Sequence, residues 1–309
     1  MILCCGEALI DMIPVDLPDG GQAFRPLPGG AVFNTAIALG RLGTEVALFS
    51  GVSNDAFGTL LADTLAANRV STDFLVRSNH LTTLAIVHLQ DGSASYSFYD
   101  ENSAGRALTN ADLPSLPDSV SALYFGGISL VEEPAADTYA TFLADAHRDR
   151  LTILDPNVRP GFIRDEVAYR TRIARMIAQS DIVKVSDEDL RWLEPGPDTL
   201  TTKARALRGR GPMVVVVTEG AKGATAYLQD TSISVPAPKA KVVDTVGAGD
   251  TFNAGFLAGL REQGCLAKKA LAEAPADAIR RALTLGARVA AVTVSRAGAN
   301  PPWASEIEP

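Results

Sequence analysis

Near its C-terminal end the chain reads Asp244-Thr245-Val246-Gly247-Ala248-Gly249-Asp250-Thr251-Phe252-Asn253-Ala254-Gly255-Phe256. A strand-like run at 241–243 precedes small residues at 247–249, and the apolar residues that follow are spaced for one face of a helix. A strand, a glycine turn and a helix start bring free backbone N–H groups and the positive end of the helix dipole to one point. The passage therefore predicts an α/β fold with an anion site, for which phosphate is the natural ligand.

Asp250 stands in the first turn of this expected helix. A cap without chemical function is the alternative, because many helices begin with an acidic residue. Beside a phosphate site, a carboxylate can accept the proton of an attacking alcohol while the amides of Gly247, Ala248 and Gly249 stabilise charge on the transferred phosphoryl group. The residues thus favour phosphoryl transfer with Asp250 as general base.

Short apolar runs alternate with helical segments along the rest of the chain, as buried parallel strands alternate with helices in layered α/β proteins. The expected strands cover 2–5, 44–50, 122–125, 151–154, 182–185 and 213–218. The expected helices cover 34–42, 57–68, 134–148, 167–179 and 201–209. No linker divides the chain, so a single domain over 1–309 is expected.

Two segments interrupt this alternation. Residues 11–28 are rich in proline and glycine, and residues 82–100 alternate around an Asp91-Gly92 turn as a β-hairpin does. Both are expected to join a small β-sheet that projects from the main one as a lid. Surface hairpins without function are the alternative.

Composition excludes several classes of function. The 309 residues carry 28 Lys and Arg against 36 Asp and Glu, a net charge of −8, so there is no basic footprint for nucleic acid or an anionic membrane. We find neither a secretory signal nor the roughly 20 apolar residues of a spanning helix. The three cysteines suit neither a disulfide framework nor a zinc site, so a cytoplasmic location is expected.

Two long motifs resemble the signatures of the ribokinase-like (PfkB) carbohydrate kinases: residues 29–43, which contain Gly29-Gly30-Ala31-Val32-Phe33-Asn34, and residues 244–257. Further matches lie at 6–11, 155–160, 184–189 and 217–223, so the resemblance runs from end to end. It implies a ribokinase-like three-layer α/β/α sandwich with a mostly parallel central sheet and a small β-sheet lid. It also implies an ATP- and Mg²⁺-dependent sugar kinase, with fructokinases the most similar members and 2-keto-3-deoxygluconate kinases next.

The resemblance assigns roles to individual residues. Asp250 would be the base for the sugar's terminal hydroxyl, and Gly247, Ala248 and Gly249 the anion hole. The expected sugar contacts are Asp11, Gly30, Asn34 and Arg159, and the expected nucleotide contacts are Lys184, Ser186, Thr218, Gly220, Gly223 and Gly249. Asp189 would reach Mg²⁺ through water, and Asp244 falls at a monovalent cation site, with K⁺ as the candidate ion. A helix cap, a strand end and a surface salt bridge are the alternatives for Asn34, Asp11 and Arg159.

The lid departs from the family where it bears on the substrate. Asp100 stands where fructokinases and 2-keto-3-deoxygluconate kinases often carry arginine, and with Glu101 it would repel an acidic sugar unless Arg106 folds back to compensate. A neutral sugar is therefore expected, D-fructose first. 2-Keto-3-deoxygluconate, ribose or a nucleoside, and a non-catalytic sugar sensor, are the alternatives. The lid sheet is also a candidate homodimer interface.

Overall fold

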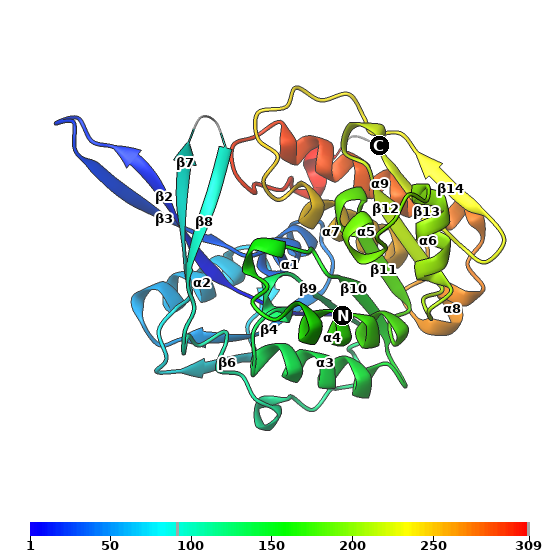
Figure 1. The fold of residues 1–309 in the computed structure, drawn as a ribbon, viewed down its shortest axis with the longest axis horizontal. Helices are drawn as coiled ribbons and strands as arrows, with labels where there is room; N and C mark the ends of the chain where they lie inside the picture. Colours follow the sequence, from blue (N-terminus) through cyan, green and yellow to red (C-terminus); the bar gives the residue numbers. More distant parts are fainter. Residues whose placement is uncertain (91–92, 308–309) are drawn as a thin grey trace.

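A computed structural model of the chain describes residues 1–90 and 93–307, which form two β-sheets and the helices around them (Figure 1). The main sheet pairs in the order β14 (Ser232–Val235), β13 (Ala224–Tyr227), β12 (Val214–Thr218), β11 (Ile182–Ser186), β10 (Leu151–Asp155), β9 (Ala122–Gly126), β1 (Ile2–Cys5), β4 (Val46–Ser53) and β5 (Val70–Ser71), with β6 (Leu75–Ser78) also on β4. Pairing is parallel from β12 to β5 and antiparallel from β12 to β14. The mostly parallel central sheet that the sequence predicts is confirmed.

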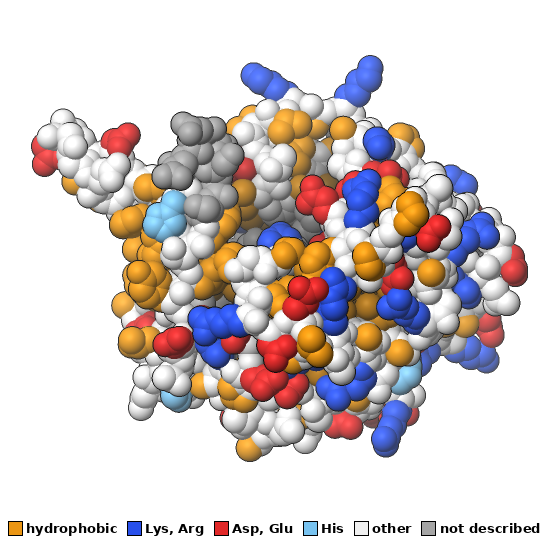
Figure 2. All heavy atoms as spheres, in the orientation of Figure 1, with side chains coloured by type: hydrophobic (Ala, Val, Ile, Leu, Met, Phe, Trp, Pro, Cys, Tyr) orange, Lys and Arg blue, Asp and Glu red, His pale blue; other side chains and the backbone are white. Residues whose placement is uncertain are grey.

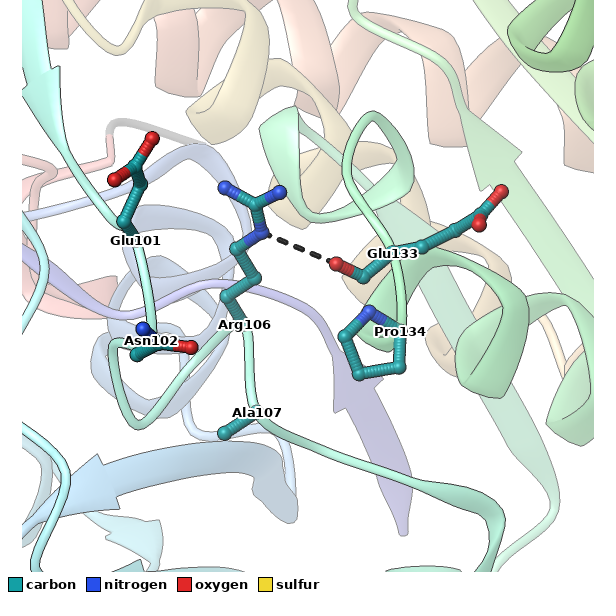
Figure 3. A pocket seen from close by; sticks show the side chains of 6 residues that line it. All are labelled: Glu101, Asn102, Arg106, Ala107, Glu133 and Pro134. Carbon is teal, nitrogen blue, oxygen red and sulfur yellow. Dashed lines mark hydrogen bonds between the residues drawn. The ribbon is translucent and has the colours of Figure 1, made fainter.

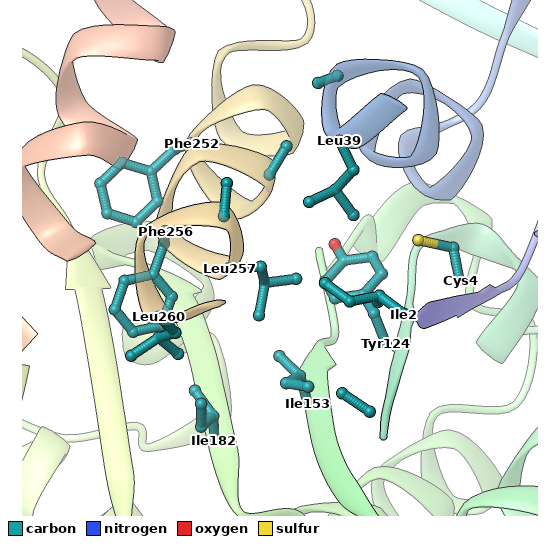
Figure 4. Close-up of a cluster of buried hydrophobic side chains, with 14 of the residues drawn as sticks. Ile2, Cys4, Leu39, Tyr124, Ile153, Ile182, Phe252, Phe256, Leu257 and Leu260 are labelled. Atoms are coloured by element: carbon teal, nitrogen blue, oxygen red, sulfur yellow. The ribbon is translucent and has the colours of Figure 1, made fainter. Parts of the chain in front are cut away.

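Helices cover both faces of this sheet because successive strand side chains point to opposite faces. Ile2 and Cys4 of β1 join a core with α1, α7 and α9, whereas Leu3 and Cys5 join a core with α3 and α4. Figure 4 shows Leu257 of α7 among the first set. The helices are α1 (Ala31–Arg41), α2 (Ala56–Ala67), α3 (Ala135–Ala146), α4 (Glu166–Ala178), α5 (Asp187–Leu193), α6 (Leu200–Arg208), α7 (Ala248–Glu262), α8 (Lys268–Ala272) and α9 (Ala276–Val294).

The second sheet is the one expected from the two interrupting segments. Its strands pair in the order β3 (Gln22–Gly29), β2 (Leu9–Asp16), β7 (Leu84–Gln90) and β8 (Ser93–Tyr99). β7 and β8 are antiparallel, as the predicted hairpin requires, while the predicted Asp91-Gly92 turn lies outside the described residues. In Figure 1, β2 and β3 extend beyond the rest of the molecule at the left.

The prediction of a strand at 241–243 is wrong. Val242 and Val243 are exposed in an irregular segment, and the amide of Val243 donates to the carbonyl of Val294 at the end of α9, 2.8 Å away. β-Branched residues favour a strand only where a neighbouring strand and a buried face complete it, and this segment has neither. The predicted anion site therefore lies at a loop-to-helix junction rather than after a strand.

Close packing of α7 against α9 fixes the helix that begins at this junction. A Cβ atom at Gly259 would lie 2.6 Å from the Cα atom of Ala282 in α9, closer than real atoms approach. We expect Gly259→Ala to lower the free energy of unfolding, because overpacking strain of about 1–3 kcal/mol outweighs the helix propensity of alanine, about 1 kcal/mol.

Urea unfolding would measure this change, with Gly209→Ala as the matched control. A Cβ atom at Gly209, at the end of α6, would make only ordinary contacts at 3.4 Å and its φ is −61°. Equal stability of the two variants would contradict a backbone-close crossing of α7 and α9.

Candidate active site

The glycine-containing loop forms the N-terminus of α7. Gly247 has a left-handed backbone (φ 76°), and a Cβ atom there would lie 2.6 Å from the Cβ atom of Ala299, so glycine suits the position on both counts. α7 begins at the next residue, Ala248. The first amides of a helix have no partner within it and point outward from its end. This is the arrangement that the predicted anion site at Gly247, Ala248 and Gly249 requires, and their contact with phosphate stays a prediction.

Asp250 lies at this helix end, 8% exposed. Its Oδ2 atom accepts a hydrogen bond from Nδ2 of Asn34 at 2.9 Å, which joins two residues 216 positions apart in the sequence. Burial raises the pKa of Asp250 to about 7, with the hydrogen bond from Asn34 opposing the rise. A carboxyl group of that pKa is suited to accept a proton near neutral pH.

Three of the expected sugar-contacting residues, Gly30, Asn34 and Asp11, lie at or near the start of α1. Gly30 precedes the helix, and the buried carboxylate of Glu7 caps it, accepting from the amide of Ala31 at 2.8 Å. Asp11 in β2 lies against Gly29, where a Cβ atom would lie closer to the Oδ2 atom of Asp11 than real atoms approach, and burial raises the pKa of Asp11 to about 6. Sequence reasoning gave Glu7 no role, although it precedes Asp11 in the quoted motif.

A buried polar cluster lies under the loop. Lys184 in β11 donates to Oδ2 of Asp155 at 2.9 Å, and Asn253 in α7 donates to the same oxygen at 2.7 Å and to the hydroxyl of Tyr124 at 2.9 Å. A Cβ atom at Gly249 would lie only 3.2 Å from Nζ of Lys184. The sequence pattern gave a role only to Lys184, but Asp155 ends a parallel strand, where α/β proteins place functional side chains.

Four of the expected nucleotide residues lie where β11 and β12 end: Ser186, Thr218, Gly220 and Gly223. None of them is hydrogen-bonded to Asp250. Ser186 and Asp189 form a capping box at the start of α5, and Oδ1 of Asp189 also accepts from the amide of Val158 at 2.9 Å. Thr218 is paired with Ser186 across β11 and β12, and Gly220 and Gly223 form the turn that follows. The capping box is thus the role the structure gives Ser186 and Asp189, and their contact with metal or phosphate stays a prediction.

Asp244 and Arg159 flank the site. The carboxylate of Asp244 accepts from the amides of Val246 at 3.0 Å and Gly298 at 2.8 Å, which ties the loop before α7 to the segment after α9. Arg159 is exposed, and its guanidinium donates only to the carbonyl of Val158 among the described residues. Both roles assigned to them stay predictions.

The lid contributes an aromatic residue that sequence reasoning missed. The register of the lid sheet places Phe98 on the face of Asp11, through Ala85 of β7, and Tyr96 follows two residues away on that face. Partial burial and then the charge of Asp11 raise the pKa of Tyr96, while Arg159 lowers it. Tyr96 therefore lies on the lid face that carries Asp11, and Figure 2 shows the surface hollowed between β8 and the region of α5 and α7.

Arg106 joins the segment after β8 to the main body through contacts with Asp100, Glu132 and Glu133. The Nη1 atom of Arg106 lies 3.6 Å from Oδ1 of Asp100, its Nη2 atom lies 3.0 Å from Glu132, and its Nε atom donates to the carbonyl of Glu133 at 3.1 Å (Figure 3). Arg106 also lines a surface pocket of about 260 Å³ with Glu101. Arg106 therefore folds back on Asp100, the condition that the sequence left open.

Two kinds of feature are absent from the described residues, a cluster of metal-binding side chains and a helix able to span a membrane. Within residues 1–90 and 93–307, no group of three or more His, Cys, Asp or Glu side chains could hold a metal ion. In the same part of the chain no helix is long and apolar enough to cross a membrane.

Known proteins resemble this chain over its length. Residues 1–306 match the pfkB family carbohydrate kinase description. The chain is 49% identical over 280 residues to a fructokinase of Rhizobium leguminosarum bv. trifolii, an alignment that covers 91% of this chain and 86% of the relative.

Solved structures agree with these sequence matches. A fructokinase with bound ATP from Xylella fastidiosa superposes with a TM-score of 0.89 at 29% identity, covering 99% of this chain and 96% of that one. A fructokinase double mutant from Vibrio cholerae O395, in fructose, ADP and potassium ion bound form, superposes at 0.82 and 27% identity, covering 96% and 93%. These matches confirm the family and the ribokinase-like fold that the two motifs implied: the chain is a carbohydrate kinase of the pfkB family.

Proposed function

We propose that this kinase transfers the γ-phosphate of ATP to the terminal hydroxyl of D-fructose, giving fructose 6-phosphate and ADP. The observation that carries the proposal is the buried Asp250, which lies at the N-terminus of α7 and is hydrogen-bonded to Asn34. This arrangement brings together the proposed base Asp250, the proposed anion site at the start of α7 and the side-chain amide of Asn34, a proposed sugar contact. The fructokinases among the relatives and solved structures support fructose as the acceptor.

In the proposed reaction, Asp250 takes the proton of the attacking sugar hydroxyl. The hydroxyl oxygen bonds to the γ-phosphorus, and the bond between the γ-phosphorus and the oxygen bridging it to the β-phosphate breaks, which releases ADP. The amides of Gly247, Ala248 and Gly249 stabilise the charge that develops on the phosphoryl oxygens. Asp11, Gly30 and Asn34 hold the sugar, with Arg159 as a further contact. Lys184, Ser186, Thr218, Gly220 and Gly223 serve the nucleotide.

Mg²⁺, when bound with ATP, would neutralise phosphate charge. Magnesium commonly keeps several waters and binds mainly through substrate phosphates, which suits a chain whose described residues offer no carboxylate cage. In this proposal Asp189 acts on the ion through water. Asp244, which closes the loop before α7, is the proposed residue for K⁺.

The proposal extends to the organisation of the chain. The whole of 1–309 is taken as one kinase domain, with segments 11–28 and 82–100 as its lid. Contact of Phe98 with Phe162 of the main body, with ring centroids 4.6 Å apart, supports a lid that meets the substrate cleft. A cytoplasmic location is part of the proposal, and the three free, buried cysteines are consistent with it.

The function is tested by ADP release from Mg-ATP with D-fructose, ribose, a nucleoside, 2-keto-3-deoxygluconate and a no-sugar blank. Turnover selective for fructose is the expected result. Turnover with only another acceptor would refute fructose specificity and keep the kinase reaction. Equilibrium sugar binding without turnover would instead indicate a sensor.

The pairing of Asp100 with Arg106 meets the condition under which Asp100 no longer repels an acidic sugar, so the preference for a neutral acceptor rests on the fructokinase relatives. Asp100 lies two residues beyond Phe98, just past the end of β8, the strand that brings Tyr96 and Phe98 to the Asp11 face. We expect Asp100→Arg to raise kcat/KM for 2-keto-3-deoxygluconate relative to fructose about tenfold or more, because a charge-assisted hydrogen bond contributes about 1.5–3 kcal/mol.

The comparison of kcat/KM for the two sugars measures this shift. Glu101→Arg is the matched control, since the side chains of Glu101 and its ion-pair partner Arg164 are 77% and 68% exposed. An unchanged sugar preference in Asp100→Arg would mean that Asp100 does not face the acceptor.

We also propose a homodimer formed through the lid. Phe24 and Tyr99 are 47% and 65% exposed, and both lie on the lid face opposite Asp11 by the strand register. A second copy would cover them. Light scattering coupled to size exclusion should give twice the chain mass for the wild type and the single mass for Phe24→Asp; a monomeric wild type would refute the dimer.

A further inference from the structure

We propose that Asp155 is a positioning residue for phosphoryl transfer: it anchors the ammonium group of Lys184 beneath the Gly247–Gly249 loop and ties it to the helix that carries Asp250. This role rests on the proposed function, because it concerns the same reaction. Asp155 itself has no direct hydrogen bond to Asp250, so it would act through Lys184 and Asn253.

The contacts of Asp155 and Asn253 together join four elements of the fold, β9, β10, β11 and α7. Oδ2 accepts from Lys184 of β11 and from Asn253 of α7, and Asn253 in turn donates to Tyr124 of β9. Oδ1 accepts from the amide of Asn157 at 3.1 Å, which fixes the turn after β10. Asn253 lies one helical turn beyond Asp250, so this carboxylate sets the position of α7 relative to the sheet edge.

Lys184 lies where a positive charge would act on the reaction. Its Nζ atom would be 3.2 Å from a Cβ atom at Gly249, which places the ammonium group directly beside the loop that receives the phosphoryl group. A lysine side chain is flexible and offers a compact point charge, so its effect depends on what holds it. The bond to Asp155 supplies that anchor.

The burial of this ion pair argues against a purely stabilising role. The side chains of Lys184 and Asp155 are 6% and 2% exposed. Removing two charges from water is costly, and well-packed apolar residues often stabilise a core as well or better. A buried ion pair whose cation lies against the proposed anion site is better explained by chemistry than by stability.

Asp155→Asn and Lys184→Met test the proposal by changing opposite charges of the pair. For Asp155→Asn we expect kcat to fall about tenfold or more, with KM for fructose within about twofold, because the ammonium group loses its anchor. The groups that act on Asp250 are Asn34 from α1, Asp155 from β10, Lys184 from β11 and Glu7 after β1, and Asp250 itself acts on Tyr124 of β9. Losing an anion should move the acid limb of kcat/KM to lower pH, and losing the cation should move it to higher pH.

Asp181→Asn is the matched control. Asp181 is a carboxylate whose side chain is 8% exposed and is paired with Lys268, but neither residue contacts the loop before α7. It should lower the melting temperature without moving the pH profile. If Asp155→Asn behaves like Asp181→Asn, with kcat unchanged, Asp155 is only structural and the proposal is overturned.

The double variant Asp155→Asn/Lys184→Met covers the case in which a single variant folds poorly. It leaves no unpaired buried charge, so its melting temperature should recover toward that of the wild type, while kcat stays low. Recovery of kcat together with stability would overturn the proposal.

Failure of the proposed function is recognised separately, as a wild type without sugar turnover. In that case ¹³C titration of the Asp250 carboxyl shows whether the pair acts on the base: opposite pKa shifts in Asp155→Asn and Lys184→Met support the proposal, and no shift in either overturns it.

Discussion

Asp250→Asn is expected to lower kcat by about 10²–10⁴-fold, the usual contribution of a general base. The amide has nearly the shape of the carboxylate, and its oxygen can still accept the hydrogen bond from Asn34. It cannot take a proton from the sugar hydroxyl. Binding of sugar and ATP should therefore survive while the chemical step is lost, so that KM changes far less than kcat.

Stability should not fall with activity in this variant. Burial raises the pKa of Asp250 to about 7, which means that the fold opposes the charged form. Replacing the group by a neutral amide removes that opposition, so the melting temperature should equal or exceed that of the wild type. Loss of activity can then be assigned to chemistry rather than unfolding.

A coupled assay of ADP release and a thermal melt measure the two quantities. Asp277→Asn is the control: Asp277 lies in the first turn of α9, its side chain is 65% exposed, and it is paired with Arg281. Its kcat should stay within about twofold of the wild type, since exposed ion pairs contribute little. Wild-type turnover in Asp250→Asn would remove Asp250 from the role of base.

Local patterns predicted the elements whose structure depends on neighbours in the sequence. β1 follows its apolar run at 2–5, and α1 covers the predicted helix at 34–42 up to Arg41 while beginning earlier, at Ala31. The run at 241–243 failed because a strand also needs a partner, and Val243 is bonded to the end of α9 instead. Propensity alone does not report that partner.

The helix start beside Asp250 could be predicted because one motif holds it, whereas contacts between distant elements were missed. Gly247 and Asp250 belong to one passage, and the position of a glycine before a helix carries its own chemistry. Asp155 and Asn253 come from β10 and α7, and their bond exists only once the sheet has assembled. Tyr96 joins the cleft through the strand register of the lid.

The activity should depend steeply on pH, and the position of that dependence should respond to Asn34. Asp250 acts as a base only when deprotonated, and its pKa is raised to about 7. Below that value each unit of pH should therefore lower kcat/KM for the sugar about tenfold, and above it the rate should level off. This acid limb lies about three units above that expected for a solvated aspartate, whose pKa is near 3.9.

Asn34→Ala should move the acid limb to still higher pH. The hydrogen bond from Asn34 stabilises the ionised carboxylate and lowers the pKa of Asp250. Without this bond, the burial of Asp250 raises its pKa further. Asn34 is also a proposed sugar contact, so KM is expected to rise; the position of the limb, rather than the height of the profile, is the quantity to measure.

Thr35→Val separates this electrostatic effect from a general disturbance of α1. The Thr35 hydroxyl donates to the backbone carbonyl of Asp250 at 3.2 Å and not to its carboxylate. Loss of this hydroxyl should leave the acid limb in place. Protonation of ATP is the same in assays of the wild type, Asn34→Ala and Thr35→Val, so it cannot produce a difference between them. A limb that stays near the wild-type position in Asn34→Ala, or that moves equally in Thr35→Val, would show that the Asn34 amide does not set the proton affinity of the base.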